Sequence, residues 1–486
     1  MDCVRREAFG SPSAIRFRPY SIQDEEVCSV NIVIVGDGKV GYTLAACLAR
    51  ENHDVTIVDR DEAALNKASE TLDVMCVRGN GANVRTMLEA GVDKADVMIA
   101  VTTNDEMNMV CCLAAKQLGA KYTVARIRDP EYTESLTVLK DKLSIDLVTN
   151  PERATAMEIS RLLRFPFAIN VETFAHGRVE MVEFRVEEFD PIANMSLITL
   201  HQRYPGVLCS AVLRGHEAII PDGRHVIRIG DRMHVLGDVM SITNFFKQLG
   251  KETKRVRSVM LLGGGRITYY FAKIIAGMGV NLTIIEENEE KCRWLNEQLG
   301  DDVNVICGDG TDEELLEQEN MTSFGALVPL LDHDEENMMA GMYAIRRGVG
   351  KVIAKVDRVN YMDVLADMGL DSVVSPKLST ANSILRTVRA LARSQSSVVE
   401  KLYRIVEDKV EALEFTAKEG APYLNVPLSK LRIRKGMIFA VLVRNRRIII
   451  PFGDDHIEAG DTVIVIARAS SVSALEDTLR EGEARR

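Results

Sequence analysis

A glycine-rich run near the start of the sequence has the residue types and spacing of a phosphate-binding turn. It follows the β-branched segment 31–35 and precedes apolar residues that recur at helical spacing. In such a turn the first glycine permits a tight bend, the second lets the backbone approach a phosphate, and the third lets the helix pack closely on the strand. N–H groups at the helix start then face the anion. The residues of this predicted cradle are Gly36, Asp37, Gly38, Lys39, Val40 and Gly41.

A carboxylate ends the next predicted strand. Asp59 follows the apolar segment 55–58. Its distance from the glycine run is close to the spacing of about 20 residues at which a carboxylate accepts a hydrogen bond from a ribose 2′-hydroxyl. The same charge would repel a 2′-phosphate. The alternative is that Asp59 only caps the end of its strand.

Further polar residues follow later predicted strands, at 74–77, 97–101 and 124–127. Carboxyl ends of parallel strands meet at one edge of an open sheet, where ligands bind. Asn80 either covers an adenine or only forms a turn, and Thr103 has the spacing to begin a capping box. An arginine at this edge can pair bidentately with phosphate. The candidates at this edge are Asn80, Thr102, Thr103 and Arg126.

The whole pattern occurs a second time. The apolar segment 258–262 leads into another glycine run, and the next strand again ends in an acid. Later motifs of the two copies, such as those around Gly79 and Gly308, keep a constant offset of 229 residues, which indicates a tandem duplication. The predicted second site consists of Gly263, Gly264, Gly265, Arg266, Ile267, Glu286 and Asp309.

The second copy departs from the first at three positions. Thr268 replaces the third glycine, Lys355 replaces Arg126, and Asp357 stands where Arg128 does. A β-branched residue at the close helix contact pushes the helix outward, and an acid near the phosphates weakens polyphosphate binding. We therefore expect weaker polyphosphate binding at the second site.

Each half of the chain continues beyond its predicted parallel sheet. Alternating apolar residues predict a smaller β-rich domain in each half, and amphipathic helices between the domains indicate packing in a core or between subunits. The predicted fold class is α/β, with two tandem Rossmann-like parallel-sheet domains, each followed by a small β-rich α+β domain. The predicted segments are a disordered extension over 1–30, Rossmann-like domains over 31–152 and 256–377, and small domains over 168–250 and 400–484.

Composition narrows the classes of partner. The net charge of −11 disfavours nucleic-acid binding, because such a surface needs a basic excess, although a local basic patch stays open. No stretch of 18 uncharged apolar residues predicts a membrane-spanning helix. The first 30 residues lack the apolar core of a secretory signal.

Several motifs together resemble the TrkA family, the peripheral regulatory subunits of bacterial Trk potassium uptake. They are GDGKVG after NIVIV, Asp59, RGNGAN, TTNDEMN and ARIRDPEY, and both domain types are duplicated. The resemblance covers residue 31 to about 484. It implies RCK domains, which regulate potassium conductance, and binding of NAD(H) or of the adenine nucleotides ATP and ADP.

The same resemblance implies the setting of the protein. It implies a homo-oligomeric ring at the cytoplasmic face of the cell membrane, beneath a membrane-embedded Trk-type potassium transporter subunit, and a regulatory role without enzymatic activity. The alternatives are an NAD-dependent oxidoreductase, which needs an acid–base group beside the nicotinamide, and a passive scaffold. The physiological nucleotide, occupancy of the second site and direction of gating stay undecided.

The extension over 1–30 generates a first prediction. Deleting residues 2–29 should leave nucleotide affinity unchanged, because the regular pattern begins at residue 31 and the preceding segment has no periodicity. Calorimetric titration of the shortened chain measures this. A large loss of affinity or of folded protein would contradict the expectation.

Overall fold

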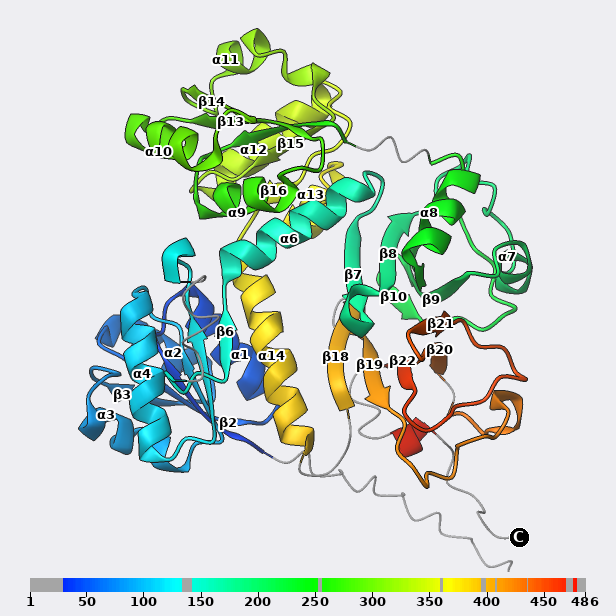
Figure 1. Ribbon diagram of the computed structural model, residues 1–486, viewed down its shortest axis with the longest axis horizontal. Helices are drawn as coiled ribbons and strands as arrows, with labels where there is room; N and C mark the ends of the chain where they lie inside the picture. The colour runs from blue at the N-terminus through cyan, green and yellow to red at the C-terminus, as the bar shows by residue number, and fades with distance from the viewer. Residues whose placement is uncertain are drawn as a thin grey trace, which may run out of the picture.

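The computed structural model describes residues 29–132, 142–251, 256–358, 362–394, 399–406, 409–434, 436–468 and 475–478. Nearly all of the expected extension over 1–30 lies outside these residues. The described chain forms two parallel-sheet domains and two smaller antiparallel domains (Figure 1). The predicted fold class is confirmed.

The first parallel-sheet domain is built from short, buried, β-branched strands. Its sheet has the order β3-β2-β1-β4-β5-β6, and every pair of neighbours is parallel. The predicted strands are found with their ends shifted by one or two residues. The strands are β1 (Asn31–Val35), β2 (Asp54–Asp59), β3 (Met75–Arg78), β4 (Val97–Ala100), β5 (Tyr122–Arg126) and β6 (Leu147–Thr149), and the helices are α1 (Lys39–Arg50), α2 (Glu62–Thr71), α3 (Val84–Glu89) and α4 (Asp105–Leu118).

The second parallel-sheet domain repeats this arrangement. Its main sheet has the order β14-β13-β12-β15, and a parallel bridge between Leu327 and Val352 leads on to the short pair β16-β17. The strands are β12 (Ser258–Leu262), β13 (Asn281–Glu286), β14 (Val303–Cys307), β15 (Ala326–Pro329), β16 (Ala354–Lys355) and β17 (Val373–Val374), and the helices are α9 (Arg266–Ile275), α10 (Glu289–Leu299), α11 (Glu313–Gln318), α12 (Asp334–Arg346) and α13 (Met362–Asp367).

The two small domains each contain a five-stranded antiparallel sheet. Apolar residues of both sheets form one shared core, which includes Met181 and Leu213 from one sheet and Val441 and Ile464 from the other. The first domain contains β7 (Asn170–Phe174), β8 (Val179–Arg185), β9 (Val207–Arg214), β10 (Glu217–Ile219), β11 (Arg232–Asp238), α7 (Leu197–Arg203) and α8 (Val239–Gln248). The second contains β18 (Val399–Val406), β19 (Val410–Thr416), β20 (Met437–Arg444), β21 (Arg447–Ile449) and β22 (Thr462–Arg468).

Two long helices exchange places between the parallel-sheet domains. Helix α6 (Pro151–Arg164) follows the first sheet but packs on α9 of the second copy. Helix α14 (Pro376–Ser394) follows the second sheet but packs on α1 of the first. The two helices also contact each other, and Figure 1 shows α14 running beside the first domain. The expected core packing of these amphipathic helices is therefore found, and it crosses from copy to copy.

A buried ion pair accompanies this exchange. The guanidinium of Arg389, on α14, forms two hydrogen bonds with the carboxylate of Glu51, which ends α1. Both side chains are mostly buried, so removing one partner would leave an uncompensated charge. The pair thus fixes the register of α14 on the first copy.

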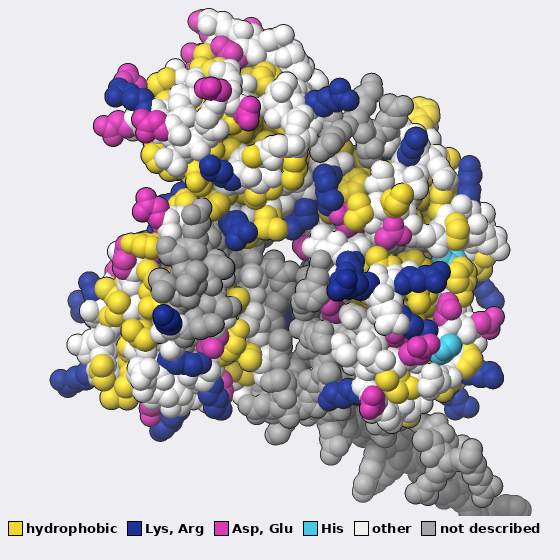
Figure 2. Space-filling view, in the orientation of Figure 1, with side chains coloured by type: hydrophobic (Ala, Val, Ile, Leu, Met, Phe, Trp, Pro, Cys, Tyr) yellow, Lys and Arg dark blue, Asp and Glu magenta, His cyan; other side chains and the backbone are white. Residues whose placement is uncertain are grey.

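Acidic side chains are exposed on the outer surface of the second copy. Acidic residues begin α10 and α11, and magenta side chains mark that region at the top of Figure 2. Among the described residues, no helix combines the length and apolarity that crossing a bilayer requires.

The helix exchange generates a second prediction. Ile384 is fully buried, and it belongs to the second copy's helix α14 but packs in the core of the first copy. Ile384→Ala should therefore reduce the free energy of unfolding by about 2–5 kcal/mol and speed hydrogen exchange in β1 and β4. Exposed Asn382, on the same helix, gives the control Asn382→Ala. Faster exchange confined to the second copy's sheet would show the packing to be wrong.

Candidate functional site

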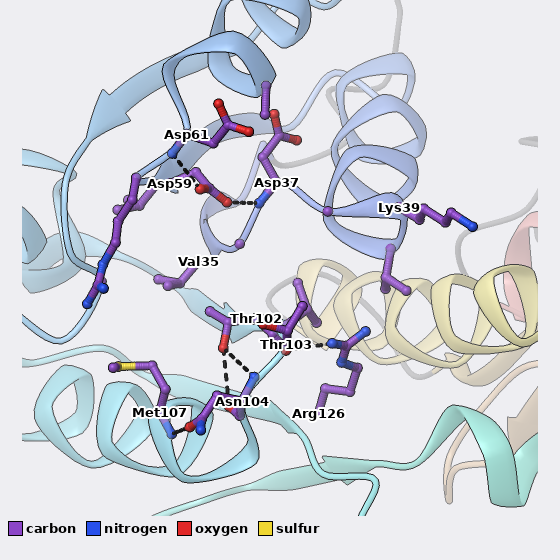
Figure 3. Close-up of a pocket in the computed structure, with 18 of the residues that line it drawn as sticks. Val35, Asp37, Lys39, Asp59, Asp61, Thr102, Thr103, Asn104, Met107 and Arg126 are labelled. Atoms are coloured by element: carbon purple, nitrogen blue, oxygen red, sulfur yellow. Dashed lines mark hydrogen bonds between the residues drawn. The ribbon is translucent and has the colours of Figure 1, made fainter. Parts of the chain in front are cut away.

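A cavity of about 620 Å³ lies at the carboxyl edge of the first sheet. Figure 3 shows its residues projecting from several strand ends toward a common space. Ten of the sequence-predicted site residues line it: Gly36, Asp37, Gly38, Lys39, Val40, Asp59, Asn80, Thr102, Thr103 and Arg126. The structure therefore brings the predicted groups of the first copy together.

The glycine turn has the close contacts that its spacing predicts. Gly36 has a φ of +106°, a conformation that L side chains rarely adopt. A Cβ on Gly41 would lie 1.8 Å from the Gly36 carbonyl oxygen, so Gly41 supports the turn beneath the cavity. Gly38 caps α1 without any side-chain hydrogen bond. The first N–H groups of α1 are thus left for an anion.

Three acidic residues, Asp37, Asp59 and Asp61, line the cavity beside the glycine turn. Asp59 ends β2, and its two carboxylate oxygens accept hydrogen bonds from the backbone N–H of Asp37 at 2.6 Å and of Asp61 at 2.9 Å. Burial and the nearby Asp59 charge raise the pKa of the Asp37 carboxyl to about 6. At neutral pH this wall therefore carries closely spaced negative charges, which disfavour a further phosphate there.

The loops after β3 and β4 contain two residues, Asn80 and Thr103, for which the sequence offered a structural alternative. Asn80 lines the cavity and also accepts a hydrogen bond from the Ala82 N–H at 3.2 Å, so it combines a turn with a site position. The alternative capping box at Thr103 is not formed. Asn104 caps α4, because its side chain accepts from the Met107 N–H at 2.6 Å. Thr103 is thereby free of a capping role and lies on the cavity wall.

Arg126 supplies a buried positive charge at the end of β5. It is 8% exposed, and one terminal nitrogen donates to the Thr102 carbonyl oxygen at 2.5 Å (Figure 3). Its Nε atom has no hydrogen-bond partner within the described chain. Burial, and next the charge of Arg128, lower the pKa of Arg126, because both disfavour the charged form. A guanidinium held in this way is a strong site for an anion.

Asn108 positions this arginine, and our sequence reasoning missed it. Its side-chain nitrogen donates to the Arg126 carbonyl oxygen at 2.8 Å, and its oxygen accepts from the Thr102 N–H at 2.9 Å. Asn108 is fully buried and so ties the end of β4 to the end of β5. Asn337, 229 residues later, bonds to the backbone of Leu331 as Asn108 does to that of Thr102, and the repetition of this asparagine was the signal in the sequence.

The second copy contributes to the first cavity, which the sequence did not predict. Asp357, Pro376 and Lys377 of the second copy line it, as does Glu152 at the start of α6. We expected Asp357 at the second site, and this is corrected: its carboxylate lies 3.8 Å from the Lys39 ammonium nitrogen at the first site. The helix exchange is the reason, since it turns the strand ends of one copy toward the glycine turn of the other.

The predicted second site is more enclosed by its own side chains. Glu286 is 5% exposed, and its carboxylate accepts from the backbone N–H of Gly264 at 2.6 Å and of Asn288 at 2.9 Å. Lys291 lies 3.7 Å from the same carboxylate. A Cβ on Gly264 would meet the Leu295 side chain at 2.6 Å. Glu286, the carboxylate expected to contact ribose, is thus already surrounded by groups of the second copy itself.

The remaining residues of that site are divided between surface and core. Ile267 is buried against α6, whereas Gly265, Arg266 and Asp309 are exposed. Gly263 repeats the strained turn of Gly36, with a φ of +103°. Asp309 accepts hydrogen bonds from Thr311, which lower its pKa.

Thr268 shows how the two turns differ. Its hydroxyl donates to the Gly263 carbonyl oxygen at 2.5 Å. In the first copy the equivalent carbonyl leaves no room for even a Cβ at Gly41. Helix α9 must therefore lie farther from its turn than α1 does, as the β-branched residue led us to expect.

Comparison with known families matches all four domains. The TrkA-N domain family matches residues 32–151 and 259–376, and the TrkA-C domain family matches residues 181–250 and 412–480. The GsuK channel has the same fold, with a TM-score of 0.60 at 18% identity over 92% of this chain and 77% of the channel chain. A GsuK channel structure bound to NAD also has a TM-score of 0.60, at 18% identity over 94% of this chain and 79% of that chain.

Named relatives match nearly the whole chain. The Trk system potassium uptake protein TrkA homolog 1 of Methanosarcina mazei is 34% identical over 91% of this chain and 98% of its own length. The Trk system potassium uptake protein TrkA of Vibrio alginolyticus is 30% identical over 90% of this chain and 95% of its own length. This chain therefore belongs to the TrkA family.

Proposed function

We propose that the chain is a nucleotide-binding regulatory subunit that gates a membrane potassium transporter in response to NAD(H) or adenine nucleotides. The observation that carries the proposal is Arg126, a buried guanidinium with an unsatisfied Nε, in the same cavity as an uncapped helix N-terminus. Both features attract phosphate. Membership of a family whose named members are potassium uptake proteins supports the regulatory role.

The cavity residues fit a nucleotide with an unphosphorylated ribose. The turn at Gly36 and Gly38 would hold phosphates, and Asp59 would accept from the ribose hydroxyls. The acidic residues beside Asp59 oppose a 2′-phosphate, which favours NAD over NADP. NAD is also the ligand of a GsuK channel structure with this fold. ATP and ADP share the adenosine and phosphate groups that these residues would contact.

Regulation fits the cavity better than oxidoreductase chemistry does. Among the described residues that line it there is no histidine, the side chain that most often transfers protons in enzymes, although carboxylates and lysines are present. The relatives' names support uptake rather than catalysis. We therefore propose that the bound nucleotide is an effector and not a hydride carrier.

The assembly and the location belong to the same proposal. The chain would form a homo-oligomeric ring at the cytoplasmic face of the membrane and act on a Trk-type transporter subunit. Its working units would be the two Rossmann-like segments 31–152 and 256–377 and the small domains 168–250 and 400–484. In a closed ring, rotation between neighbouring domains would reach the transporter.

The ribose assignment generates a third prediction. Asp59→Asn should narrow the difference in affinity between NAD and NADP by about tenfold, because it removes the charge that repels a 2′-phosphate and keeps an oxygen for one of the two backbone N–H groups that Asp59 binds. Calorimetric titration with both dinucleotides measures the ratio. Asp73→Asn alters an exposed acid in the loop after α2 and serves as the control. Unchanged discrimination in Asp59→Asn would remove the assignment.

A fourth prediction tests the function itself. Arg126→Gln should reduce the preference between triphosphate and diphosphate nucleotides by about tenfold, because a hydrogen-bonded charge is lost at the phosphates. NAD binding should persist through Asp59. Arg224→Gln, at an exposed arginine of the first small domain, is the matched control.

The readout for gating is potassium flux through the reconstituted transporter with each nucleotide. Wild-type protein should give nucleotide-dependent flux, and Arg126→Gln should lose the dependence on the third phosphate. Flux that is the same with every nucleotide, or without the subunit, would exclude the gating role.

A further inference from the structure

Asp357 reaches the first nucleotide cavity from the other copy of the repeat. It follows β16, and the carboxylate of Asp334, which begins α12, holds its backbone N–H at 3.0 Å from one oxygen and 3.1 Å from the other. The Ser375 hydroxyl donates to the Asp357 carboxylate at 3.3 Å. These bonds hold Asp357 in place independently of the first copy.

The pairing of Asp357 with Lys39 is loose. The two charged atoms are 3.8 Å apart, and the Lys39 side chain is 80% exposed. Such a pair contributes little stability, because water screens it and the lysine stays free to move. Asp357 itself is only 23% exposed, so its charge stays near the cavity when Lys39 moves. The fixed member of the pair is the acid.

Charged side chains of both signs and of both copies line the cavity, Arg128 and Lys377 among them. Arg126, on β5 of the first copy, attracts phosphate from one side, whereas Asp357 repels it from the side of the second copy. Lys39 belongs to the first turn of α1, where phosphates are expected. A ligand that engages Lys39 must approach the carboxylate next to it.

We propose that Asp357 is a specificity-determining residue of the first nucleotide site, and that its carboxylate disfavours each added phosphate. The inference rests on the proposed nucleotide-binding function. Two phosphates, as in ADP or NAD, can be held by the glycine turn and the first N–H groups of α1. A third brings additional negative charge toward Asp357, and the repulsion acts between the two copies of the repeat. A residue of the second copy thus makes the affinity depend on the number of phosphates in a nucleotide that is bound mainly by the first copy.

The matched variants separate charge from shape. Asp357→Asn should raise ATP affinity by roughly threefold to tenfold and ADP affinity by less, as expected for one unit charge removed several ångströms from the phosphates. Asp357→Glu keeps the charge and should keep the wild-type ratio of ATP to ADP affinity. Asp302→Asn removes an exposed acid at the amino end of β14, the opposite edge of the second sheet, and should change neither affinity.

Calorimetric titrations with ADP and ATP, each in EDTA and again with Mg²⁺, decide between repulsion and metal binding. Repulsion predicts that Asp357→Asn strengthens ATP binding in EDTA. A loss of ATP affinity confined to Mg²⁺ would instead make Asp357 a ligand of a nucleotide-bound cation and overturn the proposal. An unchanged ATP to ADP ratio in both buffers would also overturn it.

Two controls tell this failure from failure of the proposed function. If the unaltered chain binds nucleotides but Asp357→Asn behaves like wild type, only the role of Asp357 is lost. If the unaltered chain binds no nucleotide, the proposed function fails and this inference with it. Circular dichroism of each variant, compared with wild type, shows whether a change in affinity follows from a change in folding.

Discussion

The exchange of α6 and α14 between the two parallel-sheet domains is the constraint on which the remaining structure depends. Each helix covers the copy that it does not follow in sequence, so neither Rossmann-like domain completes its apolar core without the other. The Arg389–Glu51 pair then fixes how α14 lies along α1. Because cores are close-packed, the two copies are held at one relative orientation or at a small number of them. Such an arrangement suits a switch between discrete states.

The same exchange makes the first cavity a junction between copies. Pro151 and Glu152 begin α6, and Pro376 and Lys377 begin α14, and all four line the cavity. Any group bound against the glycine turn therefore lies beside the starts of both exchanged helices. If the proposed nucleotide binds here, a change in charge at its phosphates would act where the two copies meet, without a separate relay through the domain interiors.

Sequence patterns predicted the parts of the site that are local in the chain. Glycine spacing predicted the turn at Gly36, and the position of Asp59 at a strand end predicted its place beside that turn, because both follow from the geometry of one strand–turn–helix unit. Apolar stripes predicted that α6 and α14 are buried. They did not predict which copy each helix packs against, because an apolar stripe does not specify the surface that covers it. Asp357 was misplaced for that reason. The alternative role of Thr103 in a capping box is not found, because Asn104, one residue later, is an equally good N-cap and makes the bond.

Differences between the two glycine turns indicate that the two copies contribute differently to the structure. In the first copy Gly41 allows α1 to pack against its turn, and Asp59 stays partly exposed to a cavity. In the second copy Thr268 bonds the turn internally, and Glu286 is buried, although both carboxylates accept the same pair of backbone hydrogen bonds. The buried carboxylate is therefore less accessible to an incoming ligand than Asp59 is. The first turn is therefore the one that we propose for the nucleotide, and the second copy contributes to that site by packing and by Asp357.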